Sequence, residues 1–208
     1  MSAAPPSRHP GINLGQTDAP AHREAEETVF GFWIFLMSDL VLFALLFATY
    51  AAMLGATNGG PGPRDVLELR SVGAQTALLL LSSLSFGMAS IAMKYGAPVR
   101  RLQLWLGLTL LLGLAFLGLA LREFAHLAAE GAVPQHSGWL SSFFALVGTH
   151  GLHVALGCFW IGVMMVQVRV FGVQRPVKLR LLRLGLFWHM LDVVWIFLFS
   201  VVYLGGLA

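Results

Sequence analysis

Charged residues are scarce in this sequence of 208 residues. Asp, Glu, Lys and Arg make up only 11% of it, and 57% of its residues are hydrophobic. Soluble domains carry roughly 25% charged residues. A soluble domain of this length could not enclose so much apolar surface, because its outside must still face water. The composition therefore excludes an ordinary cytosolic enzyme.

Cysteine is almost absent too, since Cys158 is the single one. One thiol allows neither a disulfide within the chain nor a thiolate metal cage. The formal net charge is only +3, and the basic residues behind the pI of about 9.5 lie mainly in links between apolar segments. Because they form no basic face, the sequence argues against a nucleic-acid partner.

Long apolar runs are what the sequence does contain, and its mean hydropathy is +0.76. A helix needs about 20 mostly apolar residues to cross a bilayer. Five runs meet this requirement, at residues 29–54, 71–93, 102–121, 139–168 and 184–207. They predict an all-α fold, an integral membrane five-helix bundle forming one domain over residues 29–208. Residues 1–28, rich in proline and small residues, are expected to form a mobile cytoplasmic tail.

The distribution of basic residues predicts the orientation of the bundle. Arg64, Arg70 and Arg122 lie on one side of the predicted membrane, and the other ten of the 13 Lys and Arg residues lie on the other. Because cytoplasmic loops carry the excess of Lys and Arg, the N-terminus is expected to be cytoplasmic and the C-terminus periplasmic.

Acid and imidazole groups near the middle of these runs are the candidate functional residues. Asp39 in the first run should face protein or water, since an ionised Asp at the bilayer centre costs about 2.5–3.5 kcal/mol. It either hydrogen-bonds a neighbouring helix or has a role in proton handling or at a lipid pocket. No complete catalytic constellation accompanies it.

Two further pairs have i, i+3 spacing, so each pair lies on one face of its helix: His150 with His153, and His189 with Asp192. If these faces meet, they form a structural polar seam of interhelical hydrogen bonds. A haem or metal site and a proton relay are the alternatives. At the outer end of the third run, Arg122 and Glu123 are either interfacial anchors or form an ion pair with a partner helix or lipid headgroup.

Three stretches carry a resemblance to a known family. They are FGFWIFLMSDLVLF (residues 30–43), GTHGLHVALG (residues 148–157) and FWHMLDVVWIFLF (residues 187–199). The last two resemble signatures of subunit III of haem–copper terminal oxidases. The first, with the Phe-Ala-Thr-Tyr that follows at residues 47–50, is similar to the ubiquinol-oxidising branch, cytochrome o ubiquinol oxidase subunit III.

This resemblance implies an accessory subunit that binds no cofactor in a proton-pumping quinol oxidase, an oxidoreductase and translocase complex of the aerobic respiratory chain. Its expected partners are catalytic subunit I, which would hold the haem and copper, with subunits II and IV and membrane lipids, including bound phospholipid. The expected location is the bacterial inner membrane. Asp39 would match the family's buried carboxylate, usually Glu, near the lipid pocket and the proton-uptake side. His150, His153, His189 and Asp192 would be structural contacts.

Other functions remain open from the sequence. The electron donor could be cytochrome c instead of a quinol, because the donor site would lie in another subunit. A membrane haem b electron carrier would use two of the three buried histidines. A proton-coupled transporter would use Asp39 and Asp192, although the inverted repeat and the broken helix pair typical of transporters are missing.

Overall fold

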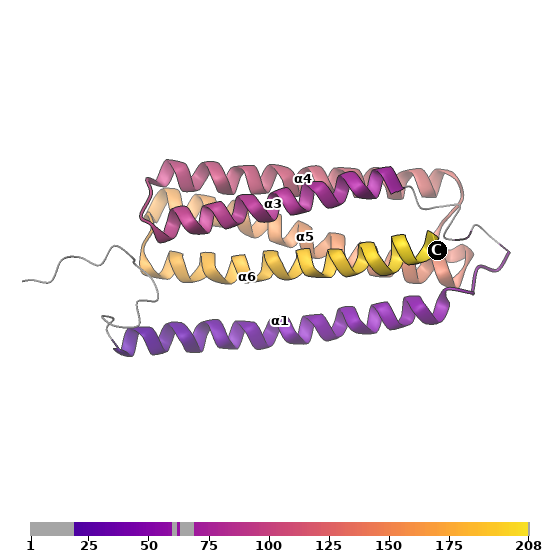
Figure 1. The fold of residues 1–208 in the computed structure, drawn as a ribbon, viewed down its shortest axis with the longest axis horizontal. Coiled ribbons are helices and arrows are strands. Elements are labelled where there is room, and N and C mark those ends of the chain that lie inside the picture. Colours follow the sequence, from indigo (N-terminus) through magenta and orange to yellow (C-terminus); the bar gives the residue numbers. More distant parts are fainter. Residues whose placement is uncertain (1–18, 60–61, 63–68, 208) are drawn as a thin grey trace, which may run out of the picture.

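The computed structural model describes residues 19–59, 62 and 69–207, and no strand occurs in these residues. Five long helices run side by side along the whole length of the molecule (Figure 1). They are α1 (Ala19–Met53), α3 (Leu69–Lys94), α4 (Val99–Ala129), α5 (Gly138–Phe171) and α6 (Arg175–Leu198). Each is long and apolar enough to cross a membrane. The predicted all-α bundle of five spans is confirmed.

Three short elements complete the described fold. The 3-10 turn η1 (Pro134–His136) precedes α5. The π-helical segment η2 (Phe199–Leu204) continues α6, and α7 (Gly205–Leu207) ends the described chain. Since a π-helical turn is wider than an α-helical one, it changes which side chains face the bundle; here Val202 and Tyr203 are buried.

Several helices extend beyond their predicted apolar runs. Helix α1 begins at Ala19, so residues 19–28 of the predicted mobile tail are helical, while residues 1–18 lie outside the described part. Helix α4 continues to Ala129 and α6 begins at Arg175. Hydropathy marks where a helix can cross lipid, whereas capping residues determine where it begins and ends.

Two capping positions on α5 illustrate this. The side chain of Ser137 accepts a hydrogen bond from the backbone N–H of Leu140 at 3.1 Å and starts the helix. Gly172 follows the last turn with a φ of +67°, a left-handed conformation that suits glycine. Helix α6 starts three residues after that glycine, with a proline in its first turn.

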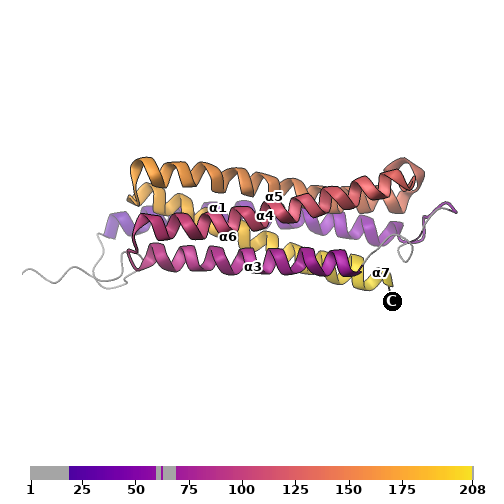
Figure 2. The same ribbon diagram turned by 90° about the horizontal axis from the view of Figure 1, so that it is seen from above.

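The packing is asymmetric. Helices α3 and α4 pair, α4 packs on α5, and α6 contacts α1, α3 and α5, whereas α1 contacts mainly α5 and α6. In Figure 1, α1 lies apart from the α3–α4 pair and runs along the opposite side of the molecule, and in Figure 2, seen from above, it lies behind α4. More than half of the apolar window of α6 is buried (56%), against 11% for α1. Helix α6 is therefore the centre of the bundle and α1 its most open member.

The start of α1, the α3–α4 link and the α5–α6 link lie at one end of the bundle (Figure 1). The end of α1, η1 and the C-terminus lie at the other. Two hydrogen bonds tie α1 and the link that follows it to α5 at this second end. The indole N–H of Trp139 lies 3.4 Å from the hydroxyl oxygen of Tyr50, and the backbone N–H of Trp139 lies 3.2 Å from the carbonyl oxygen of Ala56.

Candidate functional site: polar groups between the membrane helices

Asp39 and His153 meet between α1 and α5. The Nε2 atom of His153 lies 3.3 Å from Oδ1 of Asp39, and the two side chains are 17% and 12% exposed. Phe43 of α1 packs against the imidazole, with ring centroids 5.1 Å apart. The other carboxylate oxygen of Asp39 is buried and has no hydrogen-bond partner among the described residues. The predicted intramembrane acid therefore contacts one of the predicted histidines.

A second hydrogen bond fixes the protonation of His153. Its Nδ1 atom lies 2.7 Å from the backbone carbonyl oxygen of Thr149, one turn earlier on α5. A carbonyl oxygen only accepts hydrogen bonds, so Nδ1 must carry a proton. For Nε2 to bond Asp39, the pair must then hold one further proton, as a carboxylic acid beside neutral imidazole or as a carboxylate beside imidazolium. The geometry thus creates a site for a single shared proton.

His189 and Asp192 lie elsewhere, between α6 and α3. The Nδ1 atom of His189 lies 2.9 Å from the hydroxyl oxygen of Ser83 and 3.6 Å from Oδ2 of Asp192. Asp192 is buried, whereas the side chain of His189 is 48% exposed. His189 and Asp192 are thus close together, and Ser83, which was not among the candidates that the sequence indicated, takes part in the contact. A serine in a membrane helix gives little signal, because such residues are frequent at helix contacts.

His150 is fully buried and has an apolar setting. Its ring centroid lies 5.3 Å from Trp195, 5.9 Å from Phe116 and 6.3 Å from Phe43. Neither ring nitrogen has a hydrogen-bond partner within the described residues. Its closest neighbours are therefore aromatic rings contributed by α1, α4 and α6.

The candidate residues are thus distributed over three settings. In the described part of the chain, no hydrogen bond or ion pair joins the Asp39–His153 pair to the His189–Asp192 pair. Nor does any group of three or more His, Cys, Asp or Glu there lie close enough to hold a metal ion. The Asp39–His153 contact connects α1 to α5, and the hydrogen bond of His189 to Ser83 connects α6 to α3.

Arg122 and Glu123 point to different surroundings near the end of α4. Arg122 is exposed, whereas Glu123 is partly buried and its Oε2 accepts a hydrogen bond from the side-chain amide of Gln75 on α3 at 2.5 Å. The same amide nitrogen lies 3.3 Å from the hydroxyl of Ser71. Glu123 thereby ties α4 to α3.

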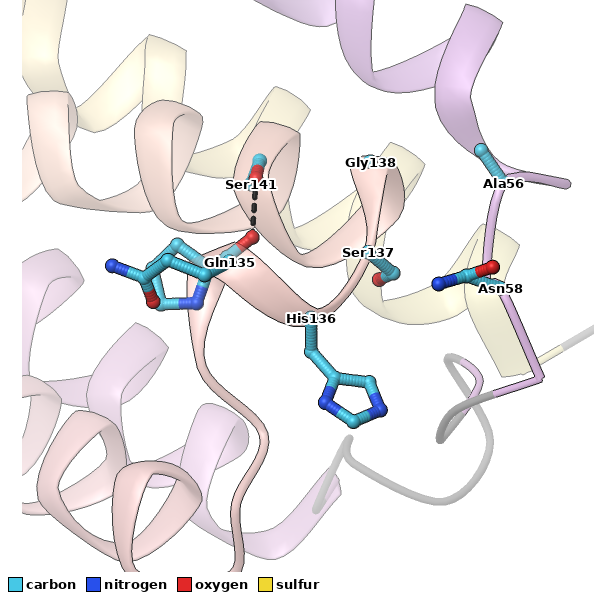
Figure 3. Close-up of a pocket in the computed structure, with 8 residues that line it drawn as sticks. Ala56, Asn58, Gln135, His136, Ser137, Gly138 and Ser141 are labelled. Atoms are coloured by element: carbon cyan, nitrogen blue, oxygen red, sulfur yellow. Dashed lines mark hydrogen bonds between the residues drawn. The ribbon is translucent and has the colours of Figure 1, made fainter.

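A cavity of about 510 Å³ opens at the end of the bundle where η1 meets α1 (Figure 3). Its lining consists of Ala56, Asn58, Pro134, Gln135, His136, Ser137, Gly138 and Ser141. The hydroxyl of Ser141 donates to the carbonyl of Pro134, and Asn58 points toward Ser137 (Figure 3). Twelve residues of α5, about 18 Å of helix, separate Ser141 from His153. The cavity is therefore distinct from the midspan pairs, and its eight lining residues include neither an acid nor a lysine or arginine.

Comparison with known proteins relates nearly the whole chain to one protein family. The family model of cytochrome c oxidase subunit III matches residues 18–207. The chain is 47% identical over 208 residues to cytochrome bo(3) ubiquinol oxidase subunit 3 of Pseudomonas aeruginosa, with 99% of each chain covered. It is 50% identical over 185 residues to the same-named subunit of Pseudomonas putida, covering 89% of each. It is also 43% identical over 185 residues to cytochrome c oxidase subunit 3 of Bacillus sp. strain PS3, again covering 89% of each.

Proposed function

Since this chain belongs to the cytochrome c oxidase subunit III family, we propose that it is subunit III of a proton-pumping ubiquinol oxidase of the bo(3) type. One observation carries the proposal, the end-to-end match to bo(3) subunits, which leaves no substantial part of either chain unmatched. Subunit III of a cytochrome c oxidase is the second candidate. It is favoured by a relative of that name, at somewhat lower identity.

The chain acts in this complex as an accessory subunit that carries no electrons. The haems and copper belong to catalytic subunit I, and subunits II and IV complete the assembly. The contacts of the candidate residues support this role, because Asp39 and His153 connect α1 to α5 while Asp192 and His189 lie against α3. Side chains engaged between helices in this way stabilise a bundle.

The Asp39–His153 pair assists proton uptake by the oxidase. Its single shared proton lies near the middle of α1, 12 residues from Glu27 and 14 from Met53. Because α1 is the most open helix of the bundle, lipid lies close to this pair. The pair contributes to the electrostatic potential that a proton experiences on its way to subunit I.

The bundle is oriented with its N-terminus in the cytoplasm and its C-terminus in the periplasm of the bacterial inner membrane. The Lys and Arg excess supports this, because the start of α1 and the α3–α4 and α5–α6 links lie at one end of the bundle. Arg122, exposed near the opposite end of α4, binds a phospholipid headgroup there.

Mild detergent extraction of a tagged chain tests the proposed function. The purified material should contain a large haem-bearing subunit, show haem b and haem o absorbance, and oxidise ubiquinol in preference to reduced cytochrome c. Membranes from an untagged strain provide the control for nonspecific binding to the affinity matrix. Recovery of the chain alone, with a tightly bound pigment, would refute the proposal in favour of a haem carrier. Preferential oxidation of cytochrome c would assign the chain to the second candidate.

A further inference from the structure

His189 lies at a depth in the membrane where a polar side chain is energetically unfavourable. It lies 14 residues after Arg175 and 15 before Leu204, at the middle of the span formed by α6 and η2. Its side chain is nevertheless 48% exposed on the outside of the bundle. At this depth the surroundings of an isolated chain are hydrocarbon, where a polar group without a partner is strongly disfavoured.

Among the described residues, only one side of the His189 imidazole has polar partners. Nδ1 faces Ser83 and Asp192, and the edge-on ring of Phe86 packs beside the imidazole with centroids 5.9 Å apart. No described residue bonds Nε2. Beneath the ring, Asp192 is only 7% exposed, and neither of its carboxylate oxygens has a hydrogen bond in the described part of the chain. An incompletely satisfied polar pair thus reaches the surface through His189.

The surface around this ring is suited to close packing by another helix. On α6, Val193 and Ile196 continue the stripe of His189 at helical spacing and are 49% and 48% exposed. On α3, Leu84 is 65% exposed, and Gly87 has open space where a side chain would begin. We call this surface, made of Leu80, Ser83, Leu84, Gly87, His189, Val193 and Ile196, the His189 face.

On the described helices, the other outward faces at this depth offer no comparable polar group. The exposed midspan residues of α4 include Leu108 and Leu111, and those of α5 include Leu156 and Phe159. On α1, the exposed hydroxyl of Ser38 donates to a carbonyl of its own helix. These faces suit lipid chains, whereas the His189 face leaves a hydrogen-bonding group that lipid chains cannot satisfy.

We propose that the His189 face docks one transmembrane helix of a neighbouring oxidase subunit, which brings a hydrogen-bonding side chain to Nε2 of His189. The identity of the neighbour as an oxidase subunit rests on the proposed function. Gly87 lets the incoming backbone approach closely, and the apolar residues around it pack against the helix. The polar contact sets the depth and rotation of that helix, because it forms at one position only.

Site-specific photocrosslinking in intact membranes tests this interface. A benzophenone amino acid replaces Leu84 or Val193 on the His189 face, and Leu111 or Phe159 on the lipid-facing control surfaces. Irradiation should yield adducts with a larger oxidase subunit at positions 84 and 193 and none at 111 and 159. Adducts of twice the chain's mass would identify a second copy as the occupant and overturn the proposal. So would lipid adducts alone at positions 84 and 193.

Two substitutions test the polar contact itself. His189→Leu should lower the recovery of the crosslinked oxidase subunit with the tagged chain about 3- to 18-fold, the range that one interhelical hydrogen bond gives. His189→Gln keeps a hydrogen-bonding side chain and should stay close to the original recovery. Equal recovery for His189→Leu and the unsubstituted chain would overturn the contact. Copurification of the unsubstituted chain with a haem-bearing oxidase is scored separately, so a failed interface and a failed proposed function give different results.

Discussion

At the scale of single residues, one hydrogen bond decides the chemistry of a neighbouring group. The carbonyl of Thr149 fixes a proton on Nδ1 of His153, and that proton obliges the Asp39–His153 contact to hold one more. The two groups share that proton, since losing it from either one removes the same hydrogen bond. An amide in place of the carboxyl would keep the contact but could not exchange that proton.

Asp39→Asn is therefore expected to leave the complex assembled and to change its turnover modestly. The Asn amide can donate to Nε2 of a neutral His153, so the contact between α1 and α5 survives. Loss of the exchangeable proton should alter ubiquinol oxidation by a factor of about two to three, under ~0.7 kcal/mol in barrier height. Turnover of purified complex normalised to haem measures the effect. Disappearance of the whole complex from the membrane would instead make Asp39 a structural residue.

His150 and His153 are only three residues apart and should respond differently to the same substitution. His153→Leu leaves the carboxyl of Asp39 without its imidazole and should lower the stability of the complex by about 1–3 kcal/mol. His150→Leu removes an imidazole that contacts aromatic rings, and should change stability by less than ~1 kcal/mol. Thermal inactivation in detergent compares the two variants. A larger loss for His150→Leu would show that its ring holds a structural hydrogen bond.

At the scale of helices, close packing depends on where a neighbour places its largest side chain. The indole of Trp188 on α6 lies between α4 and α5, and its N–H bonds the hydroxyl of Ser82 on α3 at 3.2 Å. A Cβ atom added to Gly157 would lie 2.8 Å from the indole, and one added to Gly113 would lie 2.9 Å from it. These two glycines leave space for the indole. The three helices α4, α5 and α6 therefore pack together around the side chain of Trp188.

Gly157→Ala should consequently destabilise the bundle, by about 1–3 kcal/mol, the usual cost of overpacking. Gly151→Ala on the same helix is the matched control, because a Cβ there meets nothing within 4 Å. Its stability should be unchanged or slightly higher, since Ala favours helix more than Gly does. Thermal aggregation of the detergent-solubilised complex measures both. Equal effects of the two substitutions would contradict the close approach of Trp188.

The same helices show what the sequence could predict. Hydropathy located all five spans, because burial in lipid requires a continuous apolar run. It could not identify the packing glycines. Gly113 lies in a close contact, whereas Gly151 and Gly87 face open space. Which side of a helix faces protein is decided by the rotation of its neighbours, and an apolar helix in lipid carries little sign of that rotation.

The sequence predicted which residues are candidates, but it predicted only in part which of them lie close together. The i, i+3 spacing placed His189 and Asp192 on one face of a helix, and in the structure Nδ1 of His189 lies 3.6 Å from Oδ2 of Asp192. The contact of Asp39 with His153 depends on α1 lying beside α5, and the hydrogen bond of Gln75 to Glu123 depends on α3 lying beside α4. Contacts of this second kind follow from the tertiary arrangement, on which a single sequence gives little information.

At the scale of the whole molecule, the two ends of the bundle should differ in accessibility across the membrane. Asn58→Cys lies beside the cavity at the proposed periplasmic end, and Lys94→Cys ends α3 at the proposed cytoplasmic end. A thiol reagent that cannot cross membranes should label position 58, but not position 94, in spheroplasts. The native Cys158 is buried, so the unsubstituted chain provides the background. The reverse pattern of labelling would invert the proposed orientation.

Helix α1 comes before the other long helices in the sequence, but it packs against the last two, α5 and α6. This order has a consequence for biogenesis. The bond between Asp39 and His153 spans 114 residues of sequence. A ribosome adding about 5–20 residues per second needs roughly 6–23 s to synthesise that interval. During this time Asp39 on the nascent helix α1 lies in the translocon or in lipid without His153 beside it. A cell short of the insertion machinery should therefore lose this subunit when α1 is inserted.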